Sequence, residues 1–170
     1  VVDGVYQIST PEELAWFAKT VNSGTNGINA VLNSDIELNV SGKEGLSFSE
    51  YVTDSSFSES SVNKWTPIGT ESVPFEGTFN GNGHTVSGLY VDTTDNYVGL
   101  FGSVVNPVVE TDDNGNIVVD TRISSLNVAD SYIRANQNVG GVVGYLKNAG
   151  ATNCSFSGVI DGDYNSVGGI

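Results

Sequence analysis

The chain has few basic side chains, and this scarcity limits its partners. Six Lys and Arg residues stand against 20 Asp and Glu residues, which gives a formal net charge of −14 at pH 7. Nucleic-acid binding depends on Lys and Arg side chains that neutralise phosphates, so the balance argues against a nucleic-acid partner. An anionic membrane surface is disfavoured for the same reason. A cation, a neutral glycan or a basic protein surface stays open, and solubility alone would also explain the charge.

Cysteine and histidine each occur once, which excludes several chemistries. Cys154 has no second cysteine for an internal disulfide, and its apolar position in a repeat predicts a buried structural thiol. His84 alone cannot form the His-Glu-x-x-His pair of a metallopeptidase. The sequence around His84 also lacks the Gly-x-Ser-x-Gly motif of a catalytic serine that a histidine would assist as a base. We predict that His84 is a structural or surface residue.

Long apolar runs are absent as well. No stretch of about 18 apolar residues occurs, so no membrane-spanning helix and no membrane insertion are predicted. The sequence begins directly in a globular pattern, without a secretory signal, and stops inside a repeat. We therefore expect one domain over residues 1–170 that is a fragment of a longer protein.

Glycine, in contrast, is abundant and punctuates a repeated apolar segment. Val139–Gly144 reads VGGVVG, Val98–Gly102 reads VGLFG, and Val167–Ile170 reads VGGI. The copies at Val139 and Val167 begin 28 residues apart. A unit this short cannot bury its own apolar face and must stack on its neighbours, which is typical of a solenoid.

A second apolar pattern precedes each copy. Its positions in residues 86–91 reappear in residues 123–128 and, more loosely, in residues 151–156. Ile123 lies 16 residues before the second glycine-rich copy, and Ala151 lies 16 residues before the third. The two patterns therefore share one period, and each unit contains several short apolar stretches that suit a coil of parallel strands.

Residues 10–24 form the one segment with helical spacing. Thr10, Pro11 and Glu13 have the form of a capping box, with Thr10 as the N-cap. We expect a short amphipathic helix that caps the open end of the first coil. Its apolar face would consist of Leu14, Phe17, Ala18 and Val21.

Two further segments interrupt the repeats. Residues 41–64 are rich in Ser, Gly and charge, and scattered aromatic residues predict a loop excursion with a small apolar anchor of its own. Residues 105–121 contain two alternating apolar stretches around an Asn-Gly turn, which predicts an inserted β-hairpin.

These observations predict an all-β fold. Short apolar stretches separated by Gly, Asn, Asp or Ser corners suit a right-handed parallel β-helix with one N-terminal capping α-helix and an inserted β-hairpin. Val139 and either Val142 or Val143 would point into its core. A propeller would need a blade of about 40 residues or more. A β-sandwich is the structural alternative.

Two stretches resemble the GLUG-motif repeat proteins. They are Trp65–Gly69, which reads WTPIG, and Phe75–Leu89, which reads FEGTFNGNGHTVSGL. The VGGVVG unit resembles the same family, which comprises secreted and cell-surface adhesin-like regions of bacteria, including gut bacteria, and regions beside immunoglobulin A-cleaving metallopeptidases. The resemblance implies a parallel β-helix, an extracellular or bacterial cell-surface location and a role in adhesion. It implies no catalytic residues.

Aromatic residues near strand ends are the candidate ligand-binding positions. An amphipathic ring there either stacks on a sugar face or covers the edge of a coil. The candidates are Trp16, Tyr90, Tyr97, Tyr132, Tyr145 and Tyr164.

Carboxylates offer a second, weaker set of candidates. Asp161, Asp163 and Asn165 alternate like the start of a calcium-binding loop, although Ser166 replaces the loop glycine, so calcium is considered but no cofactor is predicted. Glycoside hydrolysis needs only two carboxylates about 5 to 10 Å apart. Those that could share one face are Asp92, Asp95, Asp130, Asp161 and Asp163.

We predict a non-catalytic surface or secreted module. It would bind a host glycan or an extracellular protein, or serve as a stalk. The alternative is a polysaccharide-degrading β-helix enzyme, a lyase or a glycoside hydrolase, or a fragment of one. The sequence predicts neither the ligand nor the oligomeric state.

Overall fold

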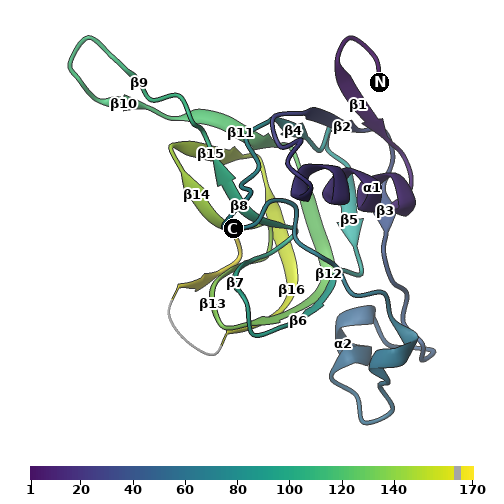
Figure 1. The fold of residues 1–170 in the computed structure, drawn as a ribbon. Helices are drawn as coiled ribbons and strands as arrows, with labels where there is room; N and C mark the ends of the chain where they lie inside the picture. The colour runs from purple at the N-terminus through teal and green to yellow at the C-terminus, as the bar shows by residue number, and fades with distance from the viewer. Residues whose placement is uncertain (163–165) are drawn as a thin grey trace.

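The structure, a computed structural model, describes residues 1–162 and 166–170 and is built mostly from short parallel β-strands in stacked sheets. The arrangement is consistent with a parallel β-solenoid (Figure 1). Two α-helices accompany the strands, α1 (Pro11–Asn22) and α2 (Phe48–Val52), and a 3₁₀ turn spans Glu59–Ser61. Of the helices in the described part of the chain, none has the length and apolarity needed to cross a membrane.

The strands of successive coils stack into parallel sheets. The first sheet contains β1 (Val5–Ile8), β2 (Asn29–Leu32), β4 (Phe79–Asn80), β11 (Asp120–Ser124) and β15 (Ala149–Thr152). The second contains β3 (Ile36–Glu37), β5 (Thr85–Ser87), β12 (Asn127–Ala135) and β16 (Ser155–Gly162), and β6 (Tyr90–Asp92) also pairs with β12. The third contains β7 (Asn96–Val98), β13 (Gln137–Gly140) and β17 (Val167–Gly168), and the fourth contains β8 (Phe101–Val105) and β14 (Val143–Lys147).

The glycine-rich copies occupy equivalent places in this stack. Val139 in β13 pairs with Val98 on one side and with Val167 on the other, so the repeat predicted the register of this sheet. Val139, Val142 and Val143 are all buried in the main core. The prediction that Val139 and one of Val142 or Val143 lie in the core is confirmed, and both of the latter are buried.

One alignment made from the sequence is wrong. Residues 123–128 do not stack on residues 86–91, because Ile123 pairs with Phe79 and Val128 pairs with Val86. The corner between Phe79 and Val86 is longer than the corner in the next coil, and this difference hid the correct match. The alignment with residues 151–156 is correct, since Ile123 pairs with Ala151 and Val128 with Phe156.

Helix α1 packs on the coil that precedes the repeats. The Thr10 hydroxyl accepts a hydrogen bond from the Glu13 amide at 3.2 Å, as the capping pattern predicted. The Glu13 carboxylate accepts from Ser9 N at 2.7 Å, one residue before the predicted partner. The four expected apolar residues are buried, and the Phe17 ring centroid lies 5.9 Å from that of Phe75. The helix therefore covers apolar side chains of the first coils.

Residues 41–64, the excursion, form a segment with a small apolar cluster of its own. Its two ends meet at Asn39, whose side chain donates to Asn63 O at 2.9 Å and accepts from Asn63 N at 2.7 Å. Helix α2, which the sequence did not predict, lies inside it (Figure 1). Phe48 and Tyr51 of α2 pack with Tyr90 of β6 in a small cluster apart from the main core.

The inserted hairpin is also present. Strands β9 (Glu110–Thr111) and β10 (Ile117–Val118) pair antiparallel around a turn that contains Gly115 at φ +81°. The hairpin extends away from the stacked sheets (Figure 1). Because it leaves and rejoins the solenoid between β8 and β11, it does not disturb the pairing of neighbouring coils.

Candidate functional site

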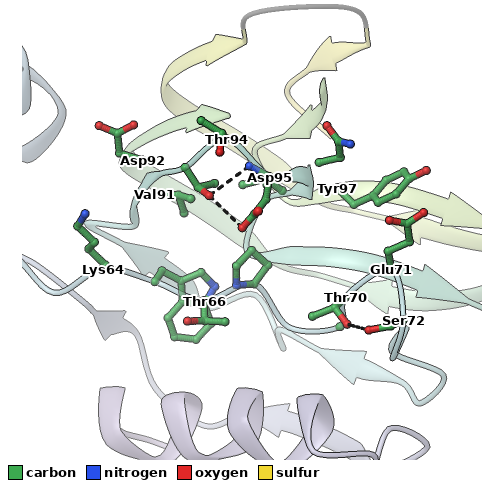
Figure 2. Close-up of a pocket in the computed structure, with 16 residues that line it drawn as sticks. Lys64, Thr66, Thr70, Glu71, Ser72, Val91, Asp92, Thr94, Asp95 and Tyr97 are labelled. Atoms are coloured by element: carbon green, nitrogen blue, oxygen red, sulfur yellow. Dashed lines mark hydrogen bonds between the residues drawn. The ribbon is translucent and has the colours of Figure 1, made fainter. Parts of the chain in front are cut away.

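A groove of about 710 Å³ lies between two segments of the solenoid (Figure 2). One wall comes from residues 64–72, which follow the excursion, and the other comes from residues 91–98, at the corner between β6 and β7. Lys64 and Tyr97 lie at opposite ends of the groove in Figure 2. A second hollow of about 480 Å³ shares Lys64, Trp65 and Thr66 and extends toward α1.

The first wall is positioned by hydrogen bonds to the solenoid. Ile68 donates its amide to Leu100 O at 3.0 Å, so the WTPIG segment runs parallel to the start of β8. The buried Trp65 indole donates to Leu100 O, also at 3.0 Å. Asn22 at the end of α1 donates to Pro67 O at 2.9 Å and accepts from Gly69 N at 2.8 Å. These contacts fix the wall independently of any ligand.

The groove exists because one strand of the stack is missing. Strand β7 is the terminal strand of its sheet among the described residues, where it pairs only with β13. The chain re-enters the stack at Trp65, whose amide donates to Tyr90 O, and Ile68 already pairs with Phe101, so only Thr66 and Pro67 pass beneath the corner that carries β7. The edge of β7 therefore borders an open space, and its backbone groups on that edge are available to a bound molecule.

Tyr97 has an unusual backbone for an aromatic residue. Its φ is +59°, and the residues stacked at the same corner, Asn138 and Ser166, have φ +54° and +65°. The corner thus demands a left-handed residue in each coil. Asn adopts that conformation readily, whereas a bulky aromatic residue does so at a cost. A strained aromatic residue at the rim of a groove motivates a functional hypothesis.

A second aromatic ring extends the rim. The Tyr145 ring, on β14, has its centroid 5.0 Å from that of Tyr97. Tyr145 is 38% exposed and Tyr97 is half-buried, so together they form an aromatic edge that solvent can reach.

The groove lining mixes polar and apolar surface and carries net negative charge. Asp95 accepts a hydrogen bond from the Thr93 hydroxyl at 2.9 Å, and this contact orders the corner (Figure 2). Three carboxylates line the groove, Glu71, Asp92 and Asp95. Lys64 is the one basic residue of the lining, and its ammonium group lies 2.6 Å from a Glu59 carboxylate oxygen. The lining suits a neutral or cationic molecule better than an anionic one.

Beside the groove, charges of opposite sign alternate along the stack. Arg134 on β12 pairs in register with Asp92 on one side and with Asp161 on the other. The Arg134 Nε atom lies 3.5 Å from Asp92 Oδ1. Two of the carboxylates that the sequence placed on one face thus flank an arginine.

Tyr90 and Tyr132 form a stacked pair in the same sheet. Their ring centroids are 5.9 Å apart with an interplanar angle of 21°. Burial, together with the nearby Asp161 and Asp92 charges, raises the pKa of the half-buried Tyr132. Tyr90 is buried beneath the excursion, and its burial raises its pKa further. The interpretation of Tyr90 as a ligand-binding ring is therefore wrong.

The remaining aromatic candidates lie apart from the groove. Trp16 on α1 is 51% exposed and packs against Tyr6, with ring centroids 5.4 Å apart. It does not line the groove, so its role in binding stays a prediction. Tyr164 lies outside the described residues.

Asp130 has a structural contact that the sequence did not suggest. Its carboxylate oxygens accept from the Phe48 and Ser49 amides, each at 2.8 Å, at the N-terminus of α2. Asp163 and Asn165, two of the three calcium candidates, lie outside the described residues. Within residues 1–162 and 166–170, no three His, Cys, Asp or Glu side chains gather closely enough to hold a metal.

His84 and Cys154 have structural surroundings. The His84 Nδ1 atom lies 3.1 Å from Asp35 Oδ1 at the surface, and Asp35 also accepts from the Thr85 amide, which lowers its pKa. Cys154 is half-buried against the main core, and burial raises the pKa of its thiol. A neutral thiol is a poor nucleophile.

Comparisons with known proteins give only partial matches. No family model matches the chain, and no solved structure matches it. A Gly-rich membrane protein of Evansella cellulosilytica is 49% identical over 41 residues, which are 24% of this chain and 5% of that protein. Halomucin of Haloquadratum walsbyi is 32% identical over 101 residues, 57% of this chain and 1% of that protein. The chain thus has a weak likeness to surface- or membrane-associated proteins and spans a small fraction of their length.

Proposed function

We propose that this chain is a non-catalytic recognition module that binds a neutral glycan in the groove beside β7. The observation that carries the proposal is the strained Tyr97 at the rim of a groove of mixed polar and apolar lining that a missing strand leaves open. The module would belong to an extracellular or cell-surface protein and serve adhesion. We also propose a right-handed solenoid, because about 98% of parallel crossover connections have that hand.

Sugar chemistry fits the lining. Sugar hydroxyls donate to carboxylates and exchange hydrogen bonds with threonine hydroxyls, and both groups line the groove. The apolar face of a sugar ring packs on aromatic rings such as Tyr97 and Tyr145. The backbone edge of β7 adds donors and acceptors at fixed positions. The net negative lining disfavours sulfated or uronic sugars, which would meet like charge.

The location rests on two independent supports. The partial matches are to surface- or membrane-associated proteins. The WTPIG and FEGTFNGNGHTVSGL stretches resemble GLUG-motif repeat proteins, which bacteria secrete or display. Neither support identifies the ligand.

A single substitution tests the glycan site. Tyr97→Asn places at this corner the residue that Asn138 already provides one coil later. We expect the variant to lose about tenfold in affinity for a neutral glycan on an array or by calorimetry. Its melting temperature should stay equal or rise, since Asn adopts a left-handed φ more readily than Tyr.

The matched control is Tyr6→Asn, a half-buried tyrosine outside the groove. It should retain glycan binding at temperatures where it is folded. Equal affinities of wild type and Tyr97→Asn, or preferential binding of sulfated glycans, would contradict the proposal.

Polysaccharide degradation is the second candidate. Asp92 and Asp95 both line the groove, so two carboxylates do face the space where a sugar would lie. Reducing-sugar or unsaturated-product release from a panel of neutral polysaccharides, abolished by Asp92→Asn or Asp95→Asn, would replace the non-catalytic proposal.

A further inference from the structure

The inserted hairpin, termed here the arm (residues 108–120), exposes an unusual set of apolar side chains. Five of them are at least 45% exposed, although residues of this kind normally lie inside. They are Val108, Val109, Ile117, Val118 and Val119. Apolar side chains grouped on a projecting element indicate a surface that meets another molecule.

The two faces of the arm differ in chemistry. Ile117 pairs with Thr111, and Val118 pairs with Glu110. Because side chains alternate between the faces of a strand, Thr111 and Ile117 share one face of the paired part, and Glu110 and Val118 share the other. The flanking residues outside the two strands add the exposed Val108, Val109 and Val119.

The arm is held at its base and ordered at its tip. The Arg122 guanidinium donates to Glu76 O at 2.9 Å and to Asn106 Oδ1 at 2.7 Å, and these bonds tie the root of the arm to the solenoid. At the tip, the Asp112 side chain accepts from the Asn114 and Asn116 amides, each at 2.9 Å. The arm therefore projects from an anchored base, away from the sheets (Figure 1).

Both outer edges of the arm are free within the described part of the chain. Strands β9 and β10 pair with each other and form a separate two-stranded sheet. A two-stranded ribbon is marginally stable in water, and an added strand supplies both hydrogen bonds and apolar cover.

Charge selects the chemistry of that added strand. The arm contains no Lys or Arg and carries Glu110, Asp112 and Asp113, whereas Asp120 at its root lies 3.2 Å from the Arg122 guanidinium. A second copy of this chain, with a net charge of −14, would bring like charge to the same edge. We infer that the arm binds an extended segment of a partner protein in which apolar and basic residues alternate. The apolar residues extend the Ile117 face, and the basic residues lie beside Glu110.

This surface is separate from the glycan groove, so the two are testable independently. The probe is a synthetic peptide with blocked ends in which Val and Lys alternate over about eight residues, the length of an ordinary strand. Binding to the intact chain is followed by fluorescence anisotropy. The comparison peptides replace Lys by Glu, or carry N-methyl groups on alternate backbone amides.

We expect the Val/Lys peptide to bind at least about tenfold more tightly than either comparison peptide, and to weaken as salt is added. Ile117→Thr combined with Val119→Thr should abolish this binding. The matched control, Val2→Thr combined with Val40→Thr, changes two exposed valines elsewhere and should retain it. Glu110→Lys should reverse the preference toward the Val/Glu peptide. Glycan binding should be unchanged in the arm variants.

Two outcomes would overturn the inference. One is equal binding of the Val/Lys and Val/Glu peptides. The other is self-association of the wild type in sedimentation that the arm variant loses, since the occupant would then be a second copy.

Discussion

Asp130 connects two parts of the chain that are far apart in sequence. Its carboxylate accepts the first two amides of α2, 82 and 81 residues away. Desolvation by partial burial opposes ionisation, but the hydrogen bonds from Ser49 and Phe48 outweigh it and lower the pKa below the ordinary 3.8. A charged acceptor at a helix N-terminus stabilises the helix through its free amides.

The first prediction concerns Asp130→Asn. Asn tolerates the left-handed φ of +46° at this position, but its amide nitrogen cannot accept a hydrogen bond. We expect about 1 kcal/mol of local destabilisation, seen as faster hydrogen exchange at Phe48 and Ser49. Asp3→Asn is the control, because Asp3 is exposed and has φ +49°. Unchanged exchange in Asp130→Asn would contradict the capping role.

The second prediction follows from the lowered pKa of Asp130. A carboxyl group whose pKa is lower in the folded state contributes stability above its unfolded pKa, and loses it as pH falls. The excursion should therefore loosen below about pH 4, as measured by near-ultraviolet circular dichroism of its aromatic cluster. Glu50 and Asp54 in the same segment also have lowered pKa values. The part due to Asp130 is the difference between wild type and Asp130→Asn, and identical acid transitions in the two would count against it.

Single residues also show which contacts could be predicted from the sequence and which could not. The helix cap at Thr10 was predictable because its partner is three residues away. The roles of Asp130 and Tyr90 were not, because both depend on an excursion that folds back from a distant part of the sequence. An aromatic residue near a strand end looks the same in sequence whether a loop covers it or solvent does.

At the level of strands and corners, close backbone approach limits what the solenoid tolerates. Gly88 has φ +68°, and a Cβ added there would lie 2.0 Å from Asn39 O. Gly45 has φ +83°, yet an added Cβ would meet nothing within 4 Å. The two positions separate the cost of a left-handed backbone from the cost of a clash.

The third prediction compares these glycines. Gly45→Ala should lower the free energy of unfolding by about 1 kcal/mol, the usual cost of a left-handed alanine. Gly88→Ala should cost well over about 2 kcal/mol, because the neighbouring backbone must also move. Urea unfolding measures both values. Equal costs would mean that the coils are not stacked as tightly as described.

The fourth prediction tests the repeat strand itself. Val142 is 0% exposed in the main core, so Val142→Asp would bury a charge without a partner and cost several kcal/mol. Val40→Asp, at a valine that is 62% exposed, is the control and should change the free energy of unfolding by less than about 0.5 kcal/mol. A Val142→Asp variant that melts with the wild type would refute the core placement.

The repeats themselves could be predicted well, and the corners less so. The match of Val98, Val139 and Val167 was visible because glycines fix the spacing around each valine. The match of Phe79 with Ile123 was missed, since turn residues between Phe79 and Val86 changed the spacing without changing the strands. Strand pairing constrains residues inside strands, while corner length varies freely.

Across the whole molecule, the groove had no signature in the sequence. The groove arises because no strand pairs with β7 on its outer edge in the described part of the chain. The absence of a strand leaves no pattern in the sequence of the residues around it. From the sequence, Tyr97 was predicted only as one of several aromatic candidates for ligand binding. Its significance appeared when its left-handed backbone and its place at the rim were known together.

The fifth prediction concerns total charge. With 20 acidic and six basic residues, self-repulsion destabilises the folded chain at low ionic strength. We expect the melting temperature to rise with NaCl and to level off near about 0.5 M, where the Debye length is only a few ångströms. The exposed ion pair of Lys43 and Asp54 will offset little of this gain. A melting temperature that falls with salt, or that rises linearly without a plateau, would contradict screening as the cause.

The hydrogen bonds of the Asn39 side chain have a consequence for how the sequence of such a chain can evolve. The Asn39 side chain, just before the excursion, bonds to the backbone of Asn63 near its end and to Gly88 O of the next coil, so the polypeptide leaves and re-enters the coil at neighbouring points. A segment with joined ends can be lengthened, shortened or exchanged without altering the path on either side. The excursion is thus a site where insertions are tolerated. Recombination there would give related proteins different surfaces on the same solenoid.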